Sequence, residues 1–215
     1  MNIANYIDHS TLKADTTKAE ILQLCKEAIA NEFYAVCVPP YWVREAKKQL
    51  KGTKVKIATV VGFPMGYSHT PAKIEESKRA IDEGANEVDW VMNIIALKEG
   101  DWNYLKNELT SATAMVHLRG GILKVILETS LLTDDEIIAA CKLCSEMSVD
   151  FVKTSTGFHG IGATVEVIEL LRKNLPSSVK IKASGGIDSL EKALALIKAG
   201  ADRVGSSESV KIVTE

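Results

Sequence analysis

The sequence predicts an α/β protein folded as a single (β/α)8 TIM barrel that takes in residues 1–215. Short runs rich in β-branched residues alternate with stretches whose apolar residues recur at helical spacing, and this pattern implies parallel strands joined by right-handed crossovers. Eight such units occupy the 215 residues, at about 27 residues to each unit. Eight units close this barrel, and the chain length is near the compact limit of roughly 200 residues for the fold.

The expected elements follow one another in a regular order. Strands are expected at residues 6–8, 34–38, 55–61, 87–92, 123–127, 151–154, 179–183 and 203–205, the first with the weakest pattern. Helices are expected at residues 18–31, 71–83, 134–147, 163–174 and 189–199, with a short one at 207–213. An open doubly wound sheet is the alternative fold, but no GxGxxG turn follows the first strand. The barrel is therefore the favoured architecture.

The composition narrows the classes of function. The chain has 26 Lys and Arg against 28 Asp and Glu, a net charge of −2, so a nucleic-acid-binding surface is not expected. No apolar run reaches the roughly 18 residues that span a bilayer, and no basic and then apolar leader opens the sequence. These features predict a cytoplasmic protein with reduced thiols and with neither a membrane nor a nucleic acid as partner.

One cysteine pair has the spacing of a metal or redox motif. Cys141 and Cys144 form a CxxC sequence, but no second ligand pair follows at a spacing suitable for zinc. Both cysteines fall in the helix expected at residues 134–147, where positions i and i+3 share one face. We therefore expect the two thiols to pack in the core, and we predict no metal site.

Charged residues near strand ends indicate where the chemistry lies, because barrels carry their active sites at the carboxyl ends of the strands. Alternation along residues 87–93 directs Asp89 into the barrel, where an unpaired carboxylate costs on the order of several kcal/mol. Asp89 therefore needs a partner or a purpose. A structural ion pair is the alternative to a catalytic role.

Two lysines lie on neighbouring expected strands. A strand spacing of roughly 4.8 Å would bring the ammonium groups of Lys153 and Lys182 within Coulombic reach. Two such groups lower each other's pKa, and a neutral amine is what attack on a carbonyl to form a Schiff base requires. With the Asp89 carboxylate nearby to move protons, the three residues predict imine chemistry. Solvated positions at the rim are the alternative for the lysines.

The last two strand-to-helix turns predict a phosphate site. Gly185 and Gly186 follow the seventh expected strand. Gly205, Ser206 and Ser207 come at the end of the eighth. Glycines allow backbone amides to approach an anion, serines add hydroxyl donors, and barrels commonly hold a phosphate in these two turns. Two ordinary tight turns are the alternative interpretation.

Several segments, in order along the chain, match one family. They are Asp-His-Ser-Thr at 8–11, Val-Cys-Val at 36–38, Val-Gly-Phe-Pro-Met-Gly at 61–66, Glu-Val-Asp at 87–89, Phe-Val-Lys-Thr-Ser-Thr-Gly-Phe at 151–158 and Lys-Ile-Lys-Ala-Ser-Gly-Gly-Ile at 180–187. The sequence thereby resembles the deoxyribose-phosphate aldolase family over nearly its whole length.

The resemblance implies roles for individual residues. Lys153 would be the Schiff-base lysine, Lys182 the neighbour that lowers its pKa, and Asp89 a proton donor and acceptor. The phosphate would be held by Gly185, Gly205, Ser206 and Ser207. The expected substrate-binding set also includes Gly157, Gly186, Asp8 and Cys37, with a structural role for Asp8 and a packing role for Cys37 as alternatives.

The family reaction is the reversible cleavage of 2-deoxy-D-ribose 5-phosphate to D-glyceraldehyde 3-phosphate and acetaldehyde. The resemblance implies that a covalent imine on Lys153 replaces any metal or other cofactor. It implies phosphosugar and aldehyde substrates and a place in nucleotide catabolism and carbohydrate degradation, and it leaves a homo-oligomer open. Two other functions compete: a sugar-phosphate-binding regulator without catalysis, and a phosphate-binding isomerase or epimerase. The paired lysines favour the aldolase.

Overall fold

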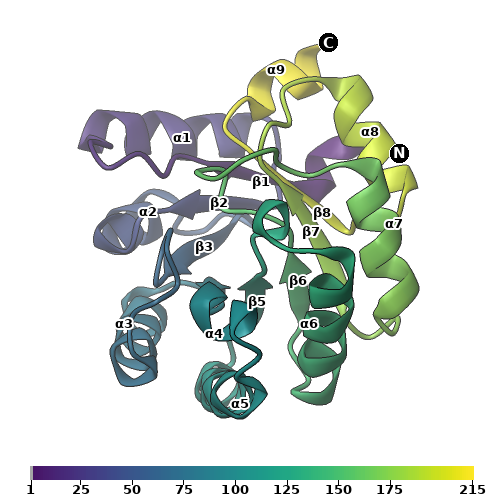
Figure 1. The fold of residues 1–215 in the computed structure, drawn as a ribbon. Helices are drawn as coiled ribbons and strands as arrows, with labels where there is room; N and C mark the ends of the chain where they lie inside the picture. The colour runs from purple at the N-terminus through teal and green to yellow at the C-terminus, as the bar shows by residue number, and fades with distance from the viewer. Residues whose placement is uncertain (1) are drawn as a thin grey trace.

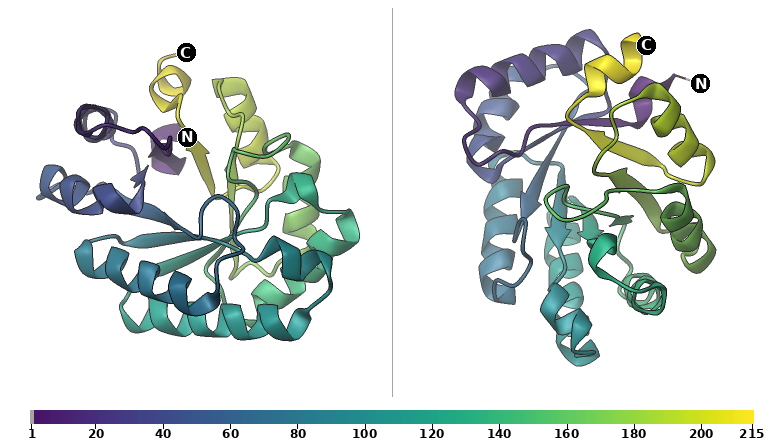
Figure 2. Two further views of the ribbon diagram at one scale, coloured as in Figure 1. Left: turned by 60° about the vertical axis from the view of Figure 1, so that its left-hand side comes forward. Right: turned by 45° about the horizontal axis from the view of Figure 1, so that its top comes forward.

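Eight parallel strands form a closed barrel in the computed structural model, which describes residues 2–215. The strands are hydrogen-bonded in chain order, and β8 returns to pair with β1. Figure 1 shows the helices arranged around the strands, and the two further views of Figure 2 show the same arrangement. The predicted (β/α)8 TIM barrel is confirmed.

The strands are β1 (Ile7–Ser10), β2 (Ala35–Val38), β3 (Lys56–Val61), β4 (Glu87–Val91), β5 (Ile122–Ile126), β6 (Phe151–Lys153), β7 (Lys180–Ser184) and β8 (Arg203–Ser206). The α-helices are α1 (Lys18–Ala30), α2 (Val43–Gln49), α3 (Thr70–Glu83), α4 (Ile94–Lys98), α5 (Trp102–Leu118), α6 (Asp134–Glu146), α7 (Val165–Asn174), α8 (Leu190–Lys198) and α9 (Ser209–Thr214). Short 3-10 helices are η1 (Ile3–Tyr6), η2 (Pro40–Trp42) and η3 (Thr129–Leu131).

Apart from the first, the predicted strands agree with these bounds to within one residue at each end. Tyr6 was expected in a strand, but it ends η1, and β1 begins one residue later. The last helix also begins later than the expected residue 207, because the Ser206 hydroxyl accepts the Glu208 N–H at 2.9 Å and holds this segment in a turn. Helices α2, α4 and α5 were not predicted. Of these, α5 buries Leu105, Leu109 and Val116 at helical spacing.

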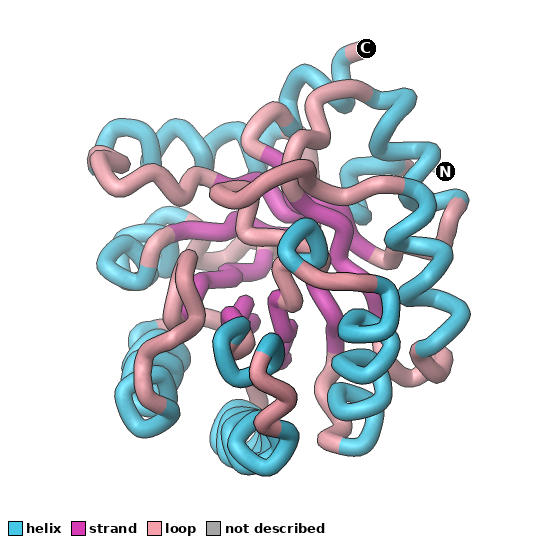
Figure 3. The backbone as a smooth tube through the Cα atoms, in the orientation of Figure 1, coloured by secondary structure: helices cyan, strands magenta, loops and turns pink. Residues whose placement is uncertain are grey.

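The apolar core lies between the strands and the surrounding helices. Val88 and Trp90 of β4 point outward, as alternation predicted, and both are fully buried in this layer. Figure 3 shows the strands at the centre of the ring of helices. Because these side chains point outward, the residues on the other face of each strand line the inside of the barrel. No helix of residues 2–215 has the length and apolarity to cross a membrane.

The CxxC pair contributes to the same apolar layer. Cys141 and Cys144 both lie on the buried side of α6 and have no measurable exposure. Burial raises the pKa of the Cys141 thiol to about 12. The predicted packing of both cysteines in a helix face is confirmed.

A buried ion pair joins α3 and α5 behind β4. The Lys73 ammonium lies 2.5 Å from the Glu108 carboxylate, and neither side chain is exposed to solvent. Lys73 also donates hydrogen bonds to the carbonyl oxygens of Gly66 at 2.9 Å and Val91 at 2.8 Å. The pair therefore fastens the loop after β3 to the end of β4, next to the mouth of the barrel.

We expect the loss of one member of this pair to destabilise the fold strongly. Glu108→Ala leaves the Lys73 ammonium buried without its carboxylate, which should lower the free energy of unfolding by about 3–5 kcal/mol in urea denaturation. The matched control is Glu75→Ala, whose ion pair with Lys78 is exposed and should contribute at most about 1 kcal/mol. Equal losses in the two variants would contradict a structural role for the buried pair.

Candidate active site

Charged side chains fill the inside of the barrel, from the first residues of β4 and β8 to the last residue of β6. Three carboxylates and four cations, from every strand except β2 and β3, lie in mutual contact, and none is more than 6% exposed. This charge cluster consists of Asp8, Glu87, Asp89, Lys124, Lys153, Lys182 and Arg203. With every group ionised, the cluster carries one excess positive charge.

Asp89 is at the centre of the charge cluster. Its Oδ2 accepts hydrogen bonds from Lys153 Nζ and Lys182 Nζ, each at 2.9 Å. Its Oδ1 accepts from Lys124 Nζ at 2.8 Å. Burial by itself would raise the pKa of this carboxyl, but the three ammonium groups hold it well below its usual range. Asp89 is therefore an anion fixed among cations, and the partner that its inward position required is found.

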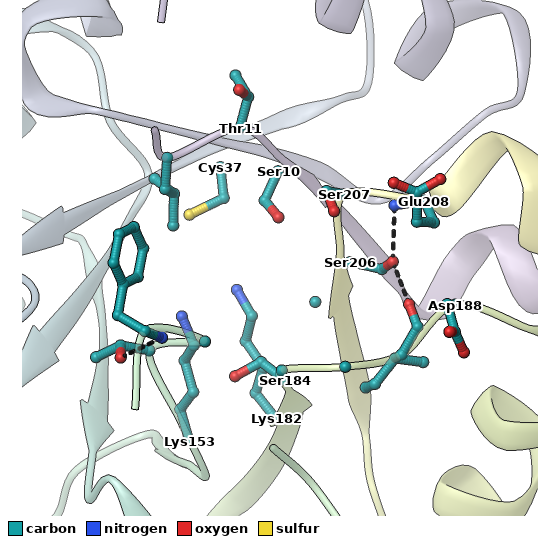
Figure 4. A pocket seen from close by; sticks show the side chains of 18 of the residues that line it. Ser10, Thr11, Cys37, Lys153, Lys182, Ser184, Asp188, Ser206, Ser207 and Glu208 are labelled. Carbon is teal, nitrogen blue, oxygen red and sulfur yellow. Dashed lines mark hydrogen bonds between the residues drawn. The ribbon is translucent and has the colours of Figure 1, made fainter. Parts of the chain in front are cut away.

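The two predicted lysines converge on one oxygen. Lys153 and Lys182 are directly paired residues of β6 and β7, and Figure 4 shows their side chains entering the cavity side by side. Burial lowers the pKa of Lys182, but Asp8 at 2.5 Å and Asp89 outweigh burial and raise it. The expectation that each ammonium lowers the other's pKa is therefore wrong for Lys182. Two carboxylates lie against this lysine, and their attraction exceeds the repulsion between the cations.

Sequence reasoning missed Lys124 and Arg203. Lys124 Nζ lies 2.5 Å from Glu87, besides its bond to Asp89. Arg203 bonds to Asp8 at 2.7 Å and to Glu87 at 3.4 Å. The signal for Lys124 was present, since it occupies an inward position in an otherwise apolar strand. For Arg203, the partners lie far away in sequence and are brought close only by the closed barrel.

A cavity of about 270 Å³ opens above the charge cluster (Figure 4). Nine of the predicted site residues line it: Cys37, Lys153, Gly157, Lys182, Gly185, Gly186, Gly205, Ser206 and Ser207. Asp8 and Asp89 are not in the lining, because both lie fully buried beneath the lysines that they contact. The structure thus brings all the predicted residues together, in two layers.

The turns after β7 and β8 form one end of the cavity. Gly185 and Gly186 have φ of +89° and +65°, values that glycine adopts readily. The Ser206 hydroxyl donates to the Ile187 carbonyl at 2.6 Å and accepts the Glu208 N–H, so it joins the two turns (Figure 4). A Cβ on Gly205 would stand 3.1 Å from Lys182 Cε, so a larger residue here would crowd this lysine.

Cys37 lines the cavity but is packed as a core residue. It is 1% exposed and contacts the small apolar group of Ala58 and Val60. Burial, helped by the negative charge of Asp89, raises the pKa of the thiol to about 11. Cys37 is therefore protonated near neutral pH and a poor nucleophile. Across residues 2–215, His, Cys, Asp and Glu side chains nowhere group in threes as a metal ion would require.

The closed barrel and the charged floor of its cavity define the class of the protein as a (β/α)8-barrel enzyme. Comparison with known families then narrows the class. Residues 2–207 match the DeoC/LacD family of aldolases, and the chain belongs to that family. The resemblance inferred from the sequence motifs is confirmed.

Individual relatives cover the whole chain. The deoxyribose-phosphate aldolase of Thermococcus gammatolerans is 50% identical over 215 residues, which are 99% of this chain and 96% of the relative. The deoxyribose-phosphate aldolase of Brevibacillus brevis is also 50% identical, over 100% of this chain and 96% of its own. Among solved structures, the tetrameric deoxyribose phosphate aldolase of Aeropyrum pernix superposes with a TM-score of 0.92 at 28% identity, covering 99% of this chain and 89% of that one.

The charge cluster makes stability depend on pH through Asp8. Burial by itself would raise the pKa of Asp8, but the surrounding cations, Lys182 first, lower it from 3.8 to about 2. The stabilisation is present above about pH 4 and is lost as the pH falls toward 2. Between these values we expect the free energy of unfolding to fall by about 2 kcal/mol more in the wild type than in Asp8→Asn. Urea denaturation at the two pH values measures this difference, and equal losses would contradict the pairing of Asp8 with cations.

Proposed function

We propose that this protein catalyses the reversible cleavage of 2-deoxy-D-ribose 5-phosphate to D-glyceraldehyde 3-phosphate and acetaldehyde through a Schiff base on Lys153. The observation that carries the proposal is the uneven pairing within the charge cluster. Lys124, Lys182 and Arg203 each contact two carboxylates. Lys153 contacts one, through an oxygen that it shares with Lys182.

This pairing leaves Lys153 as the least tightly held cation of the charge cluster. Four cations face three carboxylates, and Lys153 has the fewest carboxylate contacts among the four. Lys153 also lines the cavity, where a carbonyl carbon can reach its nitrogen. A neutral amine in that position is the nucleophile that imine formation needs.

The reaction then follows in balanced steps. The Lys153 amine attacks C1 of the open-chain sugar, and loss of water leaves an iminium. The C3 hydroxyl gives up its proton as the C2–C3 bond breaks, and its electron pair moves to the iminium to form an enamine. Glyceraldehyde 3-phosphate leaves, C2 takes up a proton, and water releases acetaldehyde and restores the amine.

The neighbouring charges have separate parts in this scheme. Asp89 stays ionised and stabilises the cationic iminium, which replaces the Lys153 ammonium beside it. Lys182, which lines the cavity and bonds to Asp89, provides the route for protons to and from the substrate. The iminium itself is the electron sink, so the proposed reaction uses no metal or other cofactor.

The phosphate is assigned to the end of the cavity formed by the turns after β7 and β8. Gly185, Gly186 and Gly205 allow backbone amides to face an anion, and the exposed Ser207 adds a hydroxyl donor. Barrels commonly bind a phosphate in these two turns. The names of the relatives support this substrate. The proposal includes a cytoplasmic enzyme of nucleotide catabolism, and an assembly of identical chains like that named for the Aeropyrum pernix protein.

Borohydride trapping tests the assignment of the nucleophile. Incubation with 2-deoxyribose 5-phosphate and borohydride should reduce the imine and label Lys153, as peptide mass spectrometry would show. Lys153→Leu should lose the label and reduce turnover to background in an assay coupled to aldehyde release. The matched control is Lys180→Leu, which removes an exposed lysine at the start of β7 and should retain both. A label on another lysine, or turnover retained in Lys153→Leu, would contradict the proposed mechanism.

A further inference from the structure

Glu128 is a buried carboxylate that the proposed chemistry does not use. It follows the end of β5 by two residues, and its side chain has no measurable exposure. Its backbone is left-handed, with φ of 57° and ψ of 60°. A residue other than glycine adopts this conformation at a cost in free energy, because its Cβ crowds the following carbonyl oxygen. Glycine would fit this backbone better, so the side chain of Glu128 has its own purpose.

The carboxylate of Glu128 is fully engaged with one residue of the next strand-end turn. The Thr156 N–H lies 3.2 Å from each carboxylate oxygen, and the Thr156 hydroxyl donates to Oε2. Within the described chain, every hydrogen bond to this carboxylate comes from Thr156. Burial strengthens these hydrogen bonds, because water does not compete for the donors. The pair therefore holds the turn after β6 against the end of β5.

The segment around Glu128 is also hydrogen-bonded to the backbone at the end of β6, the strand that carries Lys153. The Leu127 N–H donates to the Lys153 carbonyl at 3.0 Å, and the Thr129 N–H donates to the Thr154 carbonyl at 3.0 Å. Glu128 thus stands between two backbone hydrogen bonds that continue the β5–β6 pairing past the last residue of β6. Its side chain extends this attachment by two residues, into the wall of the cavity.

The turn that Glu128 holds faces the phosphate end of the cavity. Thr156, Gly157 and Phe158 all line the cavity. The Phe158 N–H donates to the Thr156 hydroxyl at 3.1 Å, and the Thr156 N–H donates to the Glu128 carboxylate. Among residues 2–215 the Gly157 N–H has no acceptor, so this amide is left for a ligand.

The neighbour of that amide is the turn assigned to the phosphate. A Cβ built on Gly185 would stand 3.7 Å from the Gly157 Cα, so the two glycines lie against each other. Gly157 has a φ of +88°, which the two flanking hydrogen bonds keep in place. We propose that Glu128 is a positioning residue, which acts through Thr156 to aim the Gly157 N–H at the substrate phosphate. This proposal rests on the proposed function.

The test is the split between substrates with and without the phosphate. Glu128→Gln replaces one acceptor oxygen by an NH2 group that faces the Thr156 donors. We expect KM for 2-deoxyribose 5-phosphate to rise about tenfold, and kcat/KM for unphosphorylated 2-deoxyribose to stay within about twofold of the wild type. A merely structural role would lower activity toward both substrates alike, and that result, or unchanged kinetics, would overturn the proposal.

Thr156 supplies the second variant and the rescue. Thr156→Val removes the hydroxyl at nearly constant volume and should give the same selective rise in KM. This variant tests the proposal independently if Glu128→Gln does not fold. Thr156→Ser keeps the hydroxyl and should remain close to the wild type. The double variant Glu128→Gln/Thr156→Val should be no worse than the poorer single variant, because both break one linkage. Multiplied losses in the double variant would contradict action through Thr156.

The chain contains a matched control. Glu20 accepts the N–H and the hydroxyl of Thr17, both at 2.7 Å, which is the same arrangement at the exposed start of α1. Glu20→Gln should leave both KM values unchanged, and a selective rise there would overturn the proposal. If the wild type does not turn over the phosphosugar, the proposed function fails. Calorimetric titration with inorganic phosphate then decides the positioning role, since Glu128→Gln should bind phosphate about tenfold more weakly, and equal affinity would overturn it.

Discussion

The structure depends on one carboxylate that three ammonium groups share. Asp89 receives Lys124 on one oxygen and both Lys153 and Lys182 on the other. Removal of these charges from water is costly, and only mutual pairing at hydrogen-bond distance offsets that cost. The same carboxylate holds Lys153, the residue proposed to form the Schiff base, beside Lys182. The interaction that holds the barrel interior together thus also positions the proposed nucleophile.

Barrel closure completes this arrangement. Because β8 pairs with β1, Asp8 at the start of the chain reaches Lys182 and Arg203 near its end. Asp8 and Asp89 therefore hold Lys182 from two sides, which keeps that lysine protonated and leaves Lys153 as the less tightly held amine. In an open sheet β1 and β8 would not be paired, so Asp8 would not reach Lys182 and this asymmetry would be absent.

The cavity has two layers that do different work. The charged floor is built by strand residues whose positions follow from register, whereas the walls are built by turns that need their own supports. The Ser206 hydroxyl ties the turns after β7 and β8, Glu128 holds the turn after β6, and Lys73 fastens the loop after β3. Each support is a buried polar side chain bonded to turn backbone, so a precise site is built on segments that lack regular secondary structure.

Much of this was determined by the sequence itself. Strand periodicity located β2 to β8 to within about one residue, directed Asp89 inward and paired Lys153 with Lys182, because side-chain direction alternates with a local period of two. The raised pKa of Lys182, the second oxygen of Asp89 bound by Lys124, and the link from Glu128 to Thr156 were decided only by the tertiary structure. Each depends on a partner more than 25 residues away. Local spacing fixes the direction in which a side chain points, but the charge that it meets there depends on which strands the closed barrel makes neighbours.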